Sequence, residues 1–491
     1  MGKVYLIGAG PGDEKLVTLK AADAVKEADV LFYDRLAPKS LLRFAKDDCE
    51  IYYCGKTPGN HYKKQDEINE MLIKAAKEGH TVGRVKGGDP YIFGRGGEEA
   101  LALKENGIEF ETISGVTSFV SVLNYAGIPV THRGLSQSFH VFTGMSAERL
   151  NIDWDAVSRL SGTLIFMMGL SNIEIIQKRL LDAGKDENTP AAVIMKGTTS
   201  KQKKVVGKLK DISKKAAEAE LKSPCIIVFG EVVNLEEELD WHIKKPLSGL
   251  NICITRSREQ TGEMREKLYS LGAEVTEINA IKTEKIEGGI EPFIKGLDFY
   301  DYIILNSVNA IEFFFDEIIE RNIDIRRISA KFPAIGEKTA DALKKRGIVP
   351  YITAEKFTLE GLYEALENKI RKGEKALFPK SENGRDYLVD KFRERGLKAD
   401  SFDLYRTVCG DRRGYEDLEG VDIIVFTSPS TFKNTVKMFG IEEVREKKII
   451  AIGPITAKAV EEAGLRCEIS RKYSVEGIID KIIEMKNKNE I

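Results

Sequence analysis

The sequence lacks any excess of charge of one sign and any cluster of cysteine or histidine. The formal net charge is −2 over 491 residues, so the chain has no basic footprint of the kind that binds nucleic acid. Its six cysteines and five histidines are scattered, with no C-x-x-C pair. Paired cysteines mark disulfide frameworks and zinc sites, so their absence predicts reduced thiols and no metal cofactor held by histidine and cysteine.

Long apolar runs are also missing, and so are targeting signals at the start. The run Val4–Ile7 is broken by glycine and is too short for a signal peptide or a membrane span. Leu6 stands where a myristoylation signal requires serine or threonine. We therefore expect a cytoplasmic protein with no membrane partner.

What the chain does contain is an alternation of short apolar runs with helical periodicity, which is typical of α/β domains. A chain of 491 residues is too long for one core. The alternation is interrupted at Ser114, and a charged stretch that closes with Pro246 and Gly249 predicts a linker. We predict α/β domains over 1–114 and 115–240 and a linker over 241–248. The strand candidates of the second domain are 139–143, 163–168, 191–195 and 225–229.

The second half of the chain contains an internal repeat. The segment AIGEKTADALKKRGI (334–348) aligns with AIGPITAKAVEEAGL (451–465) at a constant offset of 117 residues. Two flanking pairs of segments are also related, 301–314 with 422–435 and 358–361 with 474–477. Two copies are too few for a solenoid and predict two similar α/β domains with a ligand cleft between them.

A glycine loop, GAGPGD (8–13), separates the first predicted strand from a helical pattern over 16–25. Such a loop presents backbone N–H groups to an anion. A dinucleotide site is one interpretation, and Asp34 at the end of the next strand favours it as a ribose-binding acid. Asp13, however, would repel a pyrophosphate, and Pro11 removes one donor. A dinucleotide site and a structural turn without a ligand both remain open here.

A second glycine cluster, GRVKGGDPYIFGRGGEE (83–99), holds six glycines among charged residues. Glycine at this density permits positive φ and close approach of the backbone to a ligand. Because so much glycine is costly in conformational entropy, a binding loop is favoured over a purely structural one.

Four segments resemble the uroporphyrinogen-III C-methyltransferases in the same order: YLIGAGPGD (5–13), RVKGGDPYIFGRGGEE (84–99), SGVTS (114–118) and GIPVTHRG (127–134). The first loop and GGDP are shared with other corrinoid methyltransferases and diphthine synthase, whereas GRGGEE and THRG are similar to the uroporphyrinogen enzyme. The resemblance covers about 1–240 and implies a two-domain class III (tetrapyrrole) methyltransferase fold. It also implies a homodimer that binds S-adenosyl-L-methionine between its domains.

The resemblance implies which residues contact the cofactor and which carry the chemistry. The cofactor contacts fall on Pro11, Gly87, Gly88, Asp89, Ile92, Thr117, Ser118, Met168 and Gly197. Asp34 matches the family's base and Lys56 its proton donor in a double methylation that gives precorrin-2 and S-adenosyl-L-homocysteine. Three structural alternatives stay open: Asp34 as a cap, Lys56 as a surface lysine and Met168 as a buried strand residue.

The substrate implied by the resemblance carries eight carboxylates, so cations must line its cleft. The candidates are Arg35, Arg84, Arg95, His132 and Arg133. The sequence departs from the family at Ala37-Pro38, where Val-Ser is usual, which puts the local loop shape in doubt.

The C-terminal half resembles uroporphyrinogen-III synthase in the segments 254–260, 334–343, 404–408, 426–431 and 451–460. That family has a two-domain α/β fold in which the chain crosses to the second domain and returns. The crossings near 284 and 407 predict one synthase domain over 249–284 and 408–491 and another over 285–407. The implied reaction closes hydroxymethylbilane to uroporphyrinogen III with loss of water and without a cofactor.

In the synthase half, Tyr405 is the family's candidate proton donor. Four hydroxyl residues are candidates to bind substrate carboxylates, with helix capping as the alternative: Thr339, Ser428, Ser430 and Thr456. The product of this half is the substrate of the first, which supports both predictions together. Another corrinoid or protein substrate, and a non-catalytic binding module as the second half, remain alternatives. Precorrin-2 serves either sirohaem or cobalamin formation.

Overall fold

The computed structural model describes residues 2–46, 48–55, 65–145, 152–255, 262–410, 412, 415 and 417–491. They form two compact units, Met1–Asn279 with Asp411–Ile491 and Ala280–Gly410. All six cysteines lie in the described part and none forms a disulfide. In that part, no helix is both long and apolar enough to cross a membrane.

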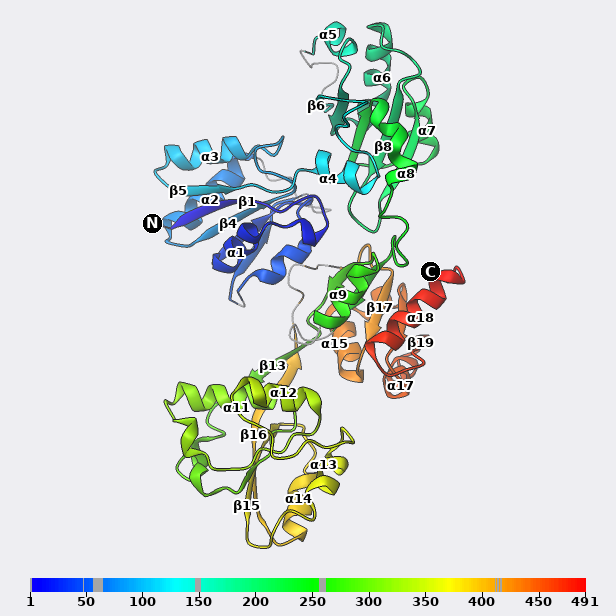
Figure 1. Ribbon diagram of the computed structural model, residues 1–491. Coiled ribbons are helices and arrows are strands. Elements are labelled where there is room, and N and C mark those ends of the chain that lie inside the picture. Colours follow the sequence, from blue (N-terminus) through cyan, green and yellow to red (C-terminus); the bar gives the residue numbers. More distant parts are fainter. Residues whose placement is uncertain are drawn as a thin grey trace. The chain divides into compact units, whose positions relative to one another are not determined.

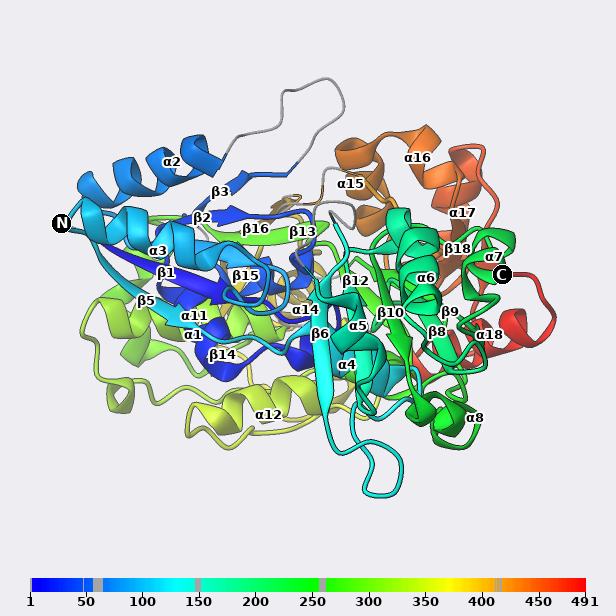
Figure 2. The same cartoon turned by 90° about the horizontal axis from the view of Figure 1, so that it is seen from above.

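The first sheet of the larger unit is parallel, with strand order β3-β2-β4-β1-β5. Its strands are β1 (Lys3–Gly8), β2 (Val30–Tyr33), β3 (Glu50–Tyr53), β4 (Val82–Lys86) and β5 (Glu109–Ile113). Helix α1 (Leu19–Glu27) covers one face, while α2 (Gln65–Lys77) and α3 (Gly96–Glu105) cover the other (Figures 1 and 2). Successive strand residues point to opposite faces, so Leu6 packs beneath α2 and α3 and Ile7 beneath α1.

The first helix begins later than the glycine loop predicts. A short 3-10 turn, η1 (Glu14–Leu16), follows the loop, and α1 starts at Leu19, where the Thr18 hydroxyl accepts a hydrogen bond from the Ala21 N–H. Leu19, which lies in the helical pattern over 16–25, is 85% exposed and does not face the core. The glycine loop therefore does not open a helix, and the pyrophosphate cradle of a dinucleotide site, which needs that helix N-terminus, is not formed.

The second sheet is mixed, with order β6-β7-β10-β8-β9. Its strands are β6 (Phe139–Thr143), β7 (Thr163–Met167), β8 (Pro190–Met195), β9 (Lys203–Lys208) and β10 (Cys225–Phe229). Helix α4 (Ser118–Tyr125) packs on one face, and α5 (Trp154–Ser158), α6 (Ile173–Asp182) and α7 (Ile212–Glu218) pack on the other. The four strand candidates are confirmed. The edge strand β9 was missed because its two valines are flanked by lysines and a glycine.

The third sheet is parallel, with order β12-β11-β17-β18-β19. Its strands are β11 (Asn251–Ile254), β12 (Glu274–Glu277), β17 (Ile423–Phe426), β18 (Lys448–Ala451) and β19 (Glu468–Ile469). Helices α9 (Gly262–Ser270) and α18 (Val475–Asn487) bury apolar side chains against it. Helices α15 (Pro429–Phe439) and α17 (Pro454–Glu462) pack against each other, with α16 (Ile441–Arg445) between them in sequence.

The smaller unit is built on one sheet of order β13-β16-β15-β14. Its strands are β13 (Ile281–Lys285), β14 (Tyr302–Ile303), β15 (Lys375–Ser381) and β16 (Lys398–Cys409). Helices α11 (Val308–Glu320) and α12 (Glu337–Lys345) cover one face, and α13 (Leu359–Leu366) and α14 (Tyr387–Glu394) the other (Figure 1). Strand β13 pairs with β16, beginning with Ile281 opposite Cys409. The two predicted chain crossings, near 284 and 407, therefore lie within this sheet.

The internal repeat of the sequence is also a repeat of local structure. Helices α12 and α17 both begin after an extended glycine, Gly336 (φ −180°) and Gly453 (φ −169°). The helices that follow, α13 and α18, are both capped by a hydroxyl that accepts from a glycine N–H. Those caps are Thr358 and Ser474. Equivalent capping at equivalent places supports a duplicated α/β unit.

Candidate functional site

The residues predicted for the methyltransferase half gather where the strands of the first sheet end. Because the strands are parallel, their carboxyl ends lie along one edge, where ligands bind in open α/β sheets. Pro11 follows β1, Asp34 follows β2, Gly87 to Asp89 follow β4, and Thr117 follows β5. Thr117 is also the N-cap residue of α4. The fold thus brings together segments that are far apart in the sequence.

Three loops approach one another through glycine backbones at this edge. The Gly88 N–H donates to the Gly10 carbonyl at 2.7 Å, and the Gly10 N–H donates to the Gly88 carbonyl at 3.2 Å. Gly88 has φ +69°. A Cβ atom on Gly115 would lie 2.1 Å from the Gly88 oxygen, and one on Gly8 would lie 2.4 Å from the Gly115 nitrogen. No side chain fits at Gly8 or Gly115, and the positive φ of Gly88 favours glycine there, which gives these glycines a structural reason.

Two aspartates tie these loops together. The Asp89 carboxylate accepts from the Gly115 N–H at 3.1 Å and from the Tyr91 N–H at 2.9 Å. Asp13 accepts from the Lys15 N–H at 2.7 Å and from the Tyr125 hydroxyl at 2.5 Å. Burial, followed by the hydrogen bond to Asp13, raises the pKa of Tyr125. Asp13 therefore stands in the glycine loop as a structural acceptor.

The second sheet contributes loops to the same region. Met168 follows β7 and Gly197 follows β8. The Thr198 hydroxyl accepts from the Asp13 N–H at 3.2 Å, so the loop after β8 contacts the first glycine loop. Among the described residues, five of the eight non-glycine residues with positive φ lie in the loops after β4, β7 and β8: Phe93, Arg95, Met168, Lys196 and Thr198. Strained backbone of this kind concentrates at functional sites, where the surrounding structure maintains it.

Large apolar side chains are exposed in the same loops. Ile92 and Met168 are each 40% exposed. The alternative of Met168 as a buried strand residue is wrong, since β7 ends at Met167 and Met168 has φ 56°. Leu36 (52% exposed) and Phe93 (42% exposed) were not predicted. The apolar run Tyr91–Phe93 inside a glycine-rich loop was a signal for this apolar surface. A loop does not need three consecutive apolar residues for packing, so such a run indicates a contact with a ligand.

Asp34 is paired with buried cations instead of capping a helix. Its Oδ1 lies 2.6 Å from Arg84 Nη2 and its Oδ2 lies 3.8 Å from Lys86 Nζ. Glu99 Oε1 lies 3.0 Å from Arg84 Nε and 2.9 Å from Lys86 Nζ. Burial lowers the pKa of Lys86, and Arg84 adds to the effect. Burial alone would also lower the pKa of Arg84, but Asp34 and Glu99 together raise it.

The other predicted charged residues differ in how far they reach solvent. Arg84 is 2% exposed and engaged by two carboxylates, which is at odds with a direct contact to a substrate carboxylate. Arg35, His132 and Arg133 are exposed, and the exposed Arg95 pairs with Glu98 at 2.6 Å. Lys56 lies outside the described residues. The sequence departs from the family at Ala37-Pro38, and Ala37 is buried in the core between the first sheet and α1.

In the smaller unit, Tyr405 lies on β16 and is 6% exposed. Its hydroxyl is 3.0 Å from the Ser307 hydroxyl, and its ring stacks on Phe313 with centroids 5.4 Å apart. Ser307 is the N-cap residue of α11 and also accepts from the Ala310 N–H. The helix start therefore fixes the position of the phenol.

The four candidate hydroxyl residues divide into two kinds. Thr339 and Thr456 are 5% and 3% exposed, and they are the third residues of α12 and α17. Neither caps its helix, since the caps are the glycines before it, so the capping alternative is wrong for both. Ser428 does cap α15, in a reciprocal pair with Thr431. Ser430 Oγ lies 2.9 Å from Ser428 Oγ.

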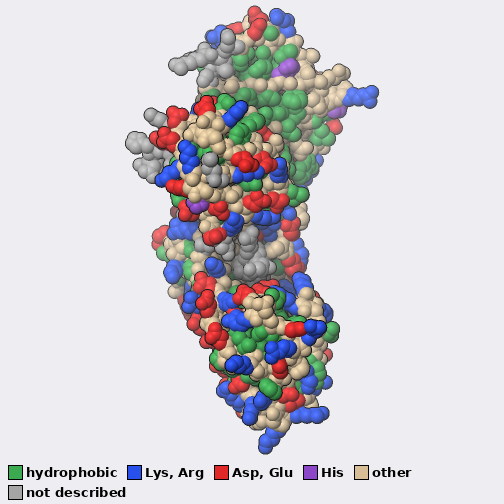
Figure 3. Space-filling view, turned by 90° about the vertical axis from the view of Figure 1, so that its left-hand side faces the viewer, with side chains coloured by type: hydrophobic (Ala, Val, Ile, Leu, Met, Phe, Trp, Pro, Cys, Tyr) green, Lys and Arg blue, Asp and Glu red, His purple; other side chains and the backbone are tan. Residues whose placement is uncertain are grey.

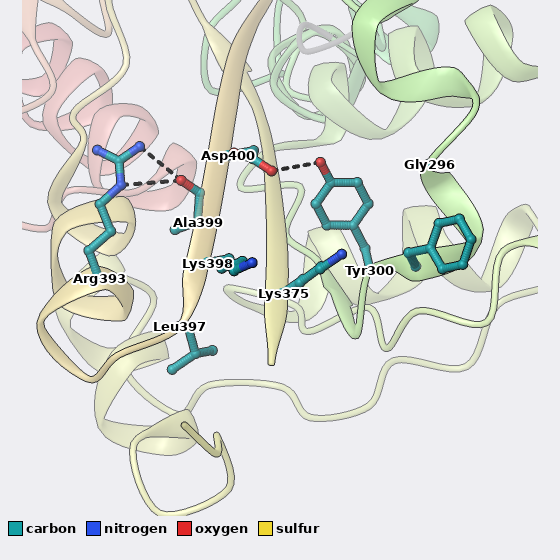
Figure 4. Close-up of a pocket in the computed structure, with 9 residues that line it drawn as sticks. Gly296, Tyr300, Lys375, Arg393, Leu397, Lys398, Ala399 and Asp400 are labelled. Atoms are coloured by element: carbon teal, nitrogen blue, oxygen red, sulfur yellow. Dashed lines mark hydrogen bonds between the residues drawn. The ribbon is translucent and has the colours of Figure 1, made fainter. Parts of the chain in front are cut away.

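The smaller unit contains a hollow of about 440 Å³ (Figure 4). It is lined by Gly296, Phe299, Tyr300, Lys375, Arg393, Leu397, Lys398, Ala399 and Asp400. Lys375 and Lys398 begin β15 and β16, whereas Tyr405 is near the other end of β16. The Tyr300 hydroxyl donates to Asp400 at 2.8 Å. No predicted site residue lines this hollow.

On the face shown in Figure 3, acidic and basic side chains are interspersed without a large region of one sign. Within the described ranges, no three histidine, cysteine, aspartate or glutamate side chains gather closely enough to hold a metal ion.

Comparison with known proteins matches both halves of the chain. Residues 3–213 match the family of tetrapyrrole (corrin/porphyrin) methylases, and residues 262–480 match uroporphyrinogen-III synthase HemD. A porphyrin biosynthesis protein HemD of Ruminiclostridium josui is 35% identical over 99% of this chain and 98% of its own length. A uroporphyrinogen-III C-methyltransferase of Bacillus subtilis (strain 168) is 36% identical over 89% of this chain and 92% of its own.

Among solved structures, a uroporphyrin-III C-methyl transferase from Thermus thermophilus, complexed with S-adenyl homocysteine, is 39% identical. It covers 48% of this chain and 99% of its own, with a TM-score of 0.42. The two family matches identify the chain as a two-part α/β protein, with a class III methyltransferase fold followed by a uroporphyrinogen-III synthase-like fold. It belongs to the tetrapyrrole methylase family, in the group that carries a HemD synthase domain in the same chain.

Proposed function

We propose that the chain catalyses two consecutive steps of tetrapyrrole biosynthesis. The C-terminal half closes hydroxymethylbilane to uroporphyrinogen III, and the N-terminal half methylates that product twice to give precorrin-2. The observation that carries the proposal is the meeting of the Gly10, Gly88 and Gly115 loops beside Asp34. Relatives that span nearly the whole chain support the pairing of the two halves.

The residues at the sheet edge fit S-adenosyl-L-methionine, which supplies an electrophilic methyl group when bound. Gly87 and Gly88 allow the backbone to approach the polar end of the cofactor. The exposed Ile92 and Met168 offer apolar contacts for its adenosine. We also assign to this site Pro11, Asp89, Thr117 and Gly197, which lie in loops, and Ser118, the first residue of α4.

In the reaction, a pyrrole carbon forms a bond to the methyl carbon while the carbon–sulfur bond breaks. Each transfer yields S-adenosyl-L-homocysteine and releases one proton from the macrocycle. Asp34 accepts that proton, and its partly exposed carboxylate is positioned for this by Arg84. The exposed Arg35, Arg95, His132 and Arg133 bind substrate carboxylates. Lys56 remains our candidate for the proton donor.

In the synthase half, hydroxide leaves hydroxymethylbilane as water after protonation, and Tyr405 is the proposed donor. Its hydroxyl is anchored by Ser307. Ser428, Ser430, Thr339 and Thr456 remain proposed contacts for carboxylates, the two threonines through the backbone at the uncapped starts of α12 and α17. We further propose a homodimer formed through the methyltransferase half. A cytoplasmic location, suggested by the scattered cysteines, is also a proposal.

The proposal predicts the product of the intact chain. Under anaerobic conditions, hydroxymethylbilane and S-adenosyl-L-methionine together should yield precorrin-2, with two S-adenosyl-L-homocysteine molecules per product by mass spectrometry. Without S-adenosyl-L-methionine, the type III isomer of uroporphyrinogen should accumulate. Formation of only the type I isomer, which arises spontaneously, would reject the synthase assignment. Absence of any dimethylated product from supplied uroporphyrinogen III would reject the methyltransferase assignment.

A second prediction concerns Tyr405. Tyr405→Phe keeps the ring that stacks on Phe313 but removes the hydroxyl. We expect the rate of type III isomer formation to fall about tenfold, which is less than the roughly 10²–10⁴-fold contribution of a typical general acid because a phenol is weakly acidic at neutral pH. Ser307→Ala should give a smaller fall, since it removes only the anchor of the hydroxyl. Isomer analysis of both variants tests this, and an unchanged rate in Tyr405→Phe would remove Tyr405 from the reaction.

A further inference from the structure

Asp34 contacts a cluster of charged residues, Arg84, Lys86 and Glu99, which we call the buried charge array. Glu99 is bonded to both cations of this array. Glu99 is 0% exposed, and its Oε1 accepts from Arg84 Nε, Lys86 Nζ and Gln65 Nε2 at 3.0, 2.9 and 3.1 Å. The three donors come from β4 and α2, while Glu99 comes from the first turn of α3. A single carboxylate oxygen thus orients both cations that face Asp34.

Arg84 transmits this arrangement to Asp34 because the guanidinium is planar and rigid. With Nε bonded to Glu99, the position of Nη2 is determined, and Nη2 lies 2.6 Å from Asp34 Oδ1. Lys86 Nζ is closer to Glu99 than to Asp34, at 2.9 Å against 3.8 Å. Glu99 therefore sets where both cations stand, and the cations set where the Asp34 carboxylate stands.

The arrangement costs stability, which points to a functional reason for it. The second oxygen of Glu99, Oε2, is buried with no hydrogen-bond partner among the described residues. Leaving a buried acceptor without a hydrogen bond destabilises the folded state, and more so when the acceptor is charged. Replacing buried ion networks by apolar residues is often neutral or stabilising. A carboxylate needed only to attach α3 to the sheet would not require this burial.

We propose that Glu99 is a positioning residue for methyl transfer, which acts through Arg84 and Lys86 to orient the Asp34 carboxylate at the edge where the glycine loops meet. In this proposal Arg84 positions Asp34 and does not bind the substrate. The inference rests on the proposed methyltransferase function and adds to it three residues that do not touch the cofactor or substrate.

The test compares Glu99→Gln with a matched control, Glu111→Gln. Glu111 is also a carboxylate that pairs with two cations, Lys3 of β1 and Lys20 of α1, but it is partly exposed and lies on the edge strand β5. In the intact protein, supplied with uroporphyrinogen III and S-adenosyl-L-methionine, Glu99→Gln should lower kcat by about tenfold to a hundredfold, the effect of a small misplacement at the reacting centre. The Kd for S-adenosyl-L-homocysteine should change by less than about threefold. Glu111→Gln should keep kcat within about twofold of the native value.

Two further variants keep the inference testable if Glu99→Gln folds poorly. The double variant Glu99→Gln with Lys86→Met restores the balance of buried charge, so it should recover the unfolding temperature while kcat stays low. Arg84→Lys keeps the charge but loses the rigid fork, and it should lower kcat with Glu99 intact.

Several outcomes would overturn the proposal. A native kcat in the double variant or in Arg84→Lys would show that these buried charges have only a structural role. The same conclusion would follow if kcat fell no further in Glu99→Gln than in Glu111→Gln. A parallel loss of S-adenosyl-L-homocysteine affinity would place Glu99 in the cofactor site instead. If the native chain itself does not methylate uroporphyrinogen III, the proposed function fails first, and the two failures are distinguished by that measurement.

Discussion

Asp34→Asn should abolish methyl transfer by the intact chain while cofactor binding persists. The amide has the same shape as the carboxylate and can still accept from Arg84 Nη2, which lies 2.6 Å from Oδ1. It cannot take up the proton that leaves the macrocycle, and loss of a general base lowers rates by about 10²–10⁴-fold. Single-turnover formation of S-adenosyl-L-homocysteine measures the rate, and calorimetry with S-adenosyl-L-homocysteine measures binding.

Asp29→Asn is the matched control for this substitution, because Asp29 precedes β2 and Asp34 follows it. Asp29 accepts from Lys46 Nζ and from the Thr81 N–H, each at 2.8 Å. The hydrogen bond from Lys46, followed by that from Thr81, lowers the pKa of Asp29. Asp29→Asn should keep the native rate of methyl transfer. Loss of cofactor affinity in Asp34→Asn would instead move Asp34 from the base to the cofactor contacts.

Gly115→Ala should remove cofactor binding and destabilise the larger unit. The new Cβ would lie 2.1 Å from the Gly88 oxygen and 2.7 Å from the Gly8 carbonyl carbon, and both neighbours are backbone. Neither can move without separating the loops that follow β1, β4 and β5. Overpacking of this kind costs about 1–3 kcal/mol. We expect at least a tenfold loss of S-adenosyl-L-homocysteine affinity, because the loops that form the site must shift.

Gly97→Ala provides the control, because a Cβ there would meet no atom within 4 Å. Gly97 lies in α3, where alanine is favoured over glycine by roughly 0.5–1 kcal/mol. This variant should bind S-adenosyl-L-homocysteine with native affinity and unfold at the same or a slightly higher temperature. Native affinity in Gly115→Ala would show that the close approach of the three loops is not required for the cofactor.

Local patterns in the sequence were sufficient for four of the five strands of the second sheet and for the duplication. The four strand candidates in 139–229 are found as β6, β7, β8 and β10; the last three are apolar runs buried within the sheet, and β6 lies at its edge. The repeat was visible as a constant offset, and its two copies start their helices with the same extended glycine. Strand β9 and the delayed start of α1 escaped, since neither has a strong local signal.

By itself the sequence determined several of the strands, the duplication of one unit and the concentration of glycine in two loops. Only the tertiary structure decided that Gly8, Gly88 and Gly115 meet, and that Arg84 is buried between Asp34 and Glu99. The physical reason is the distance along the chain over which each kind of interaction acts. Periodicity and turn chemistry act over a few residues, whereas the Asp34–Arg84 pair joins positions 50 residues apart in sequence. Such a pairing follows from strand order alone, because β2 and β4 are neighbours in the sheet.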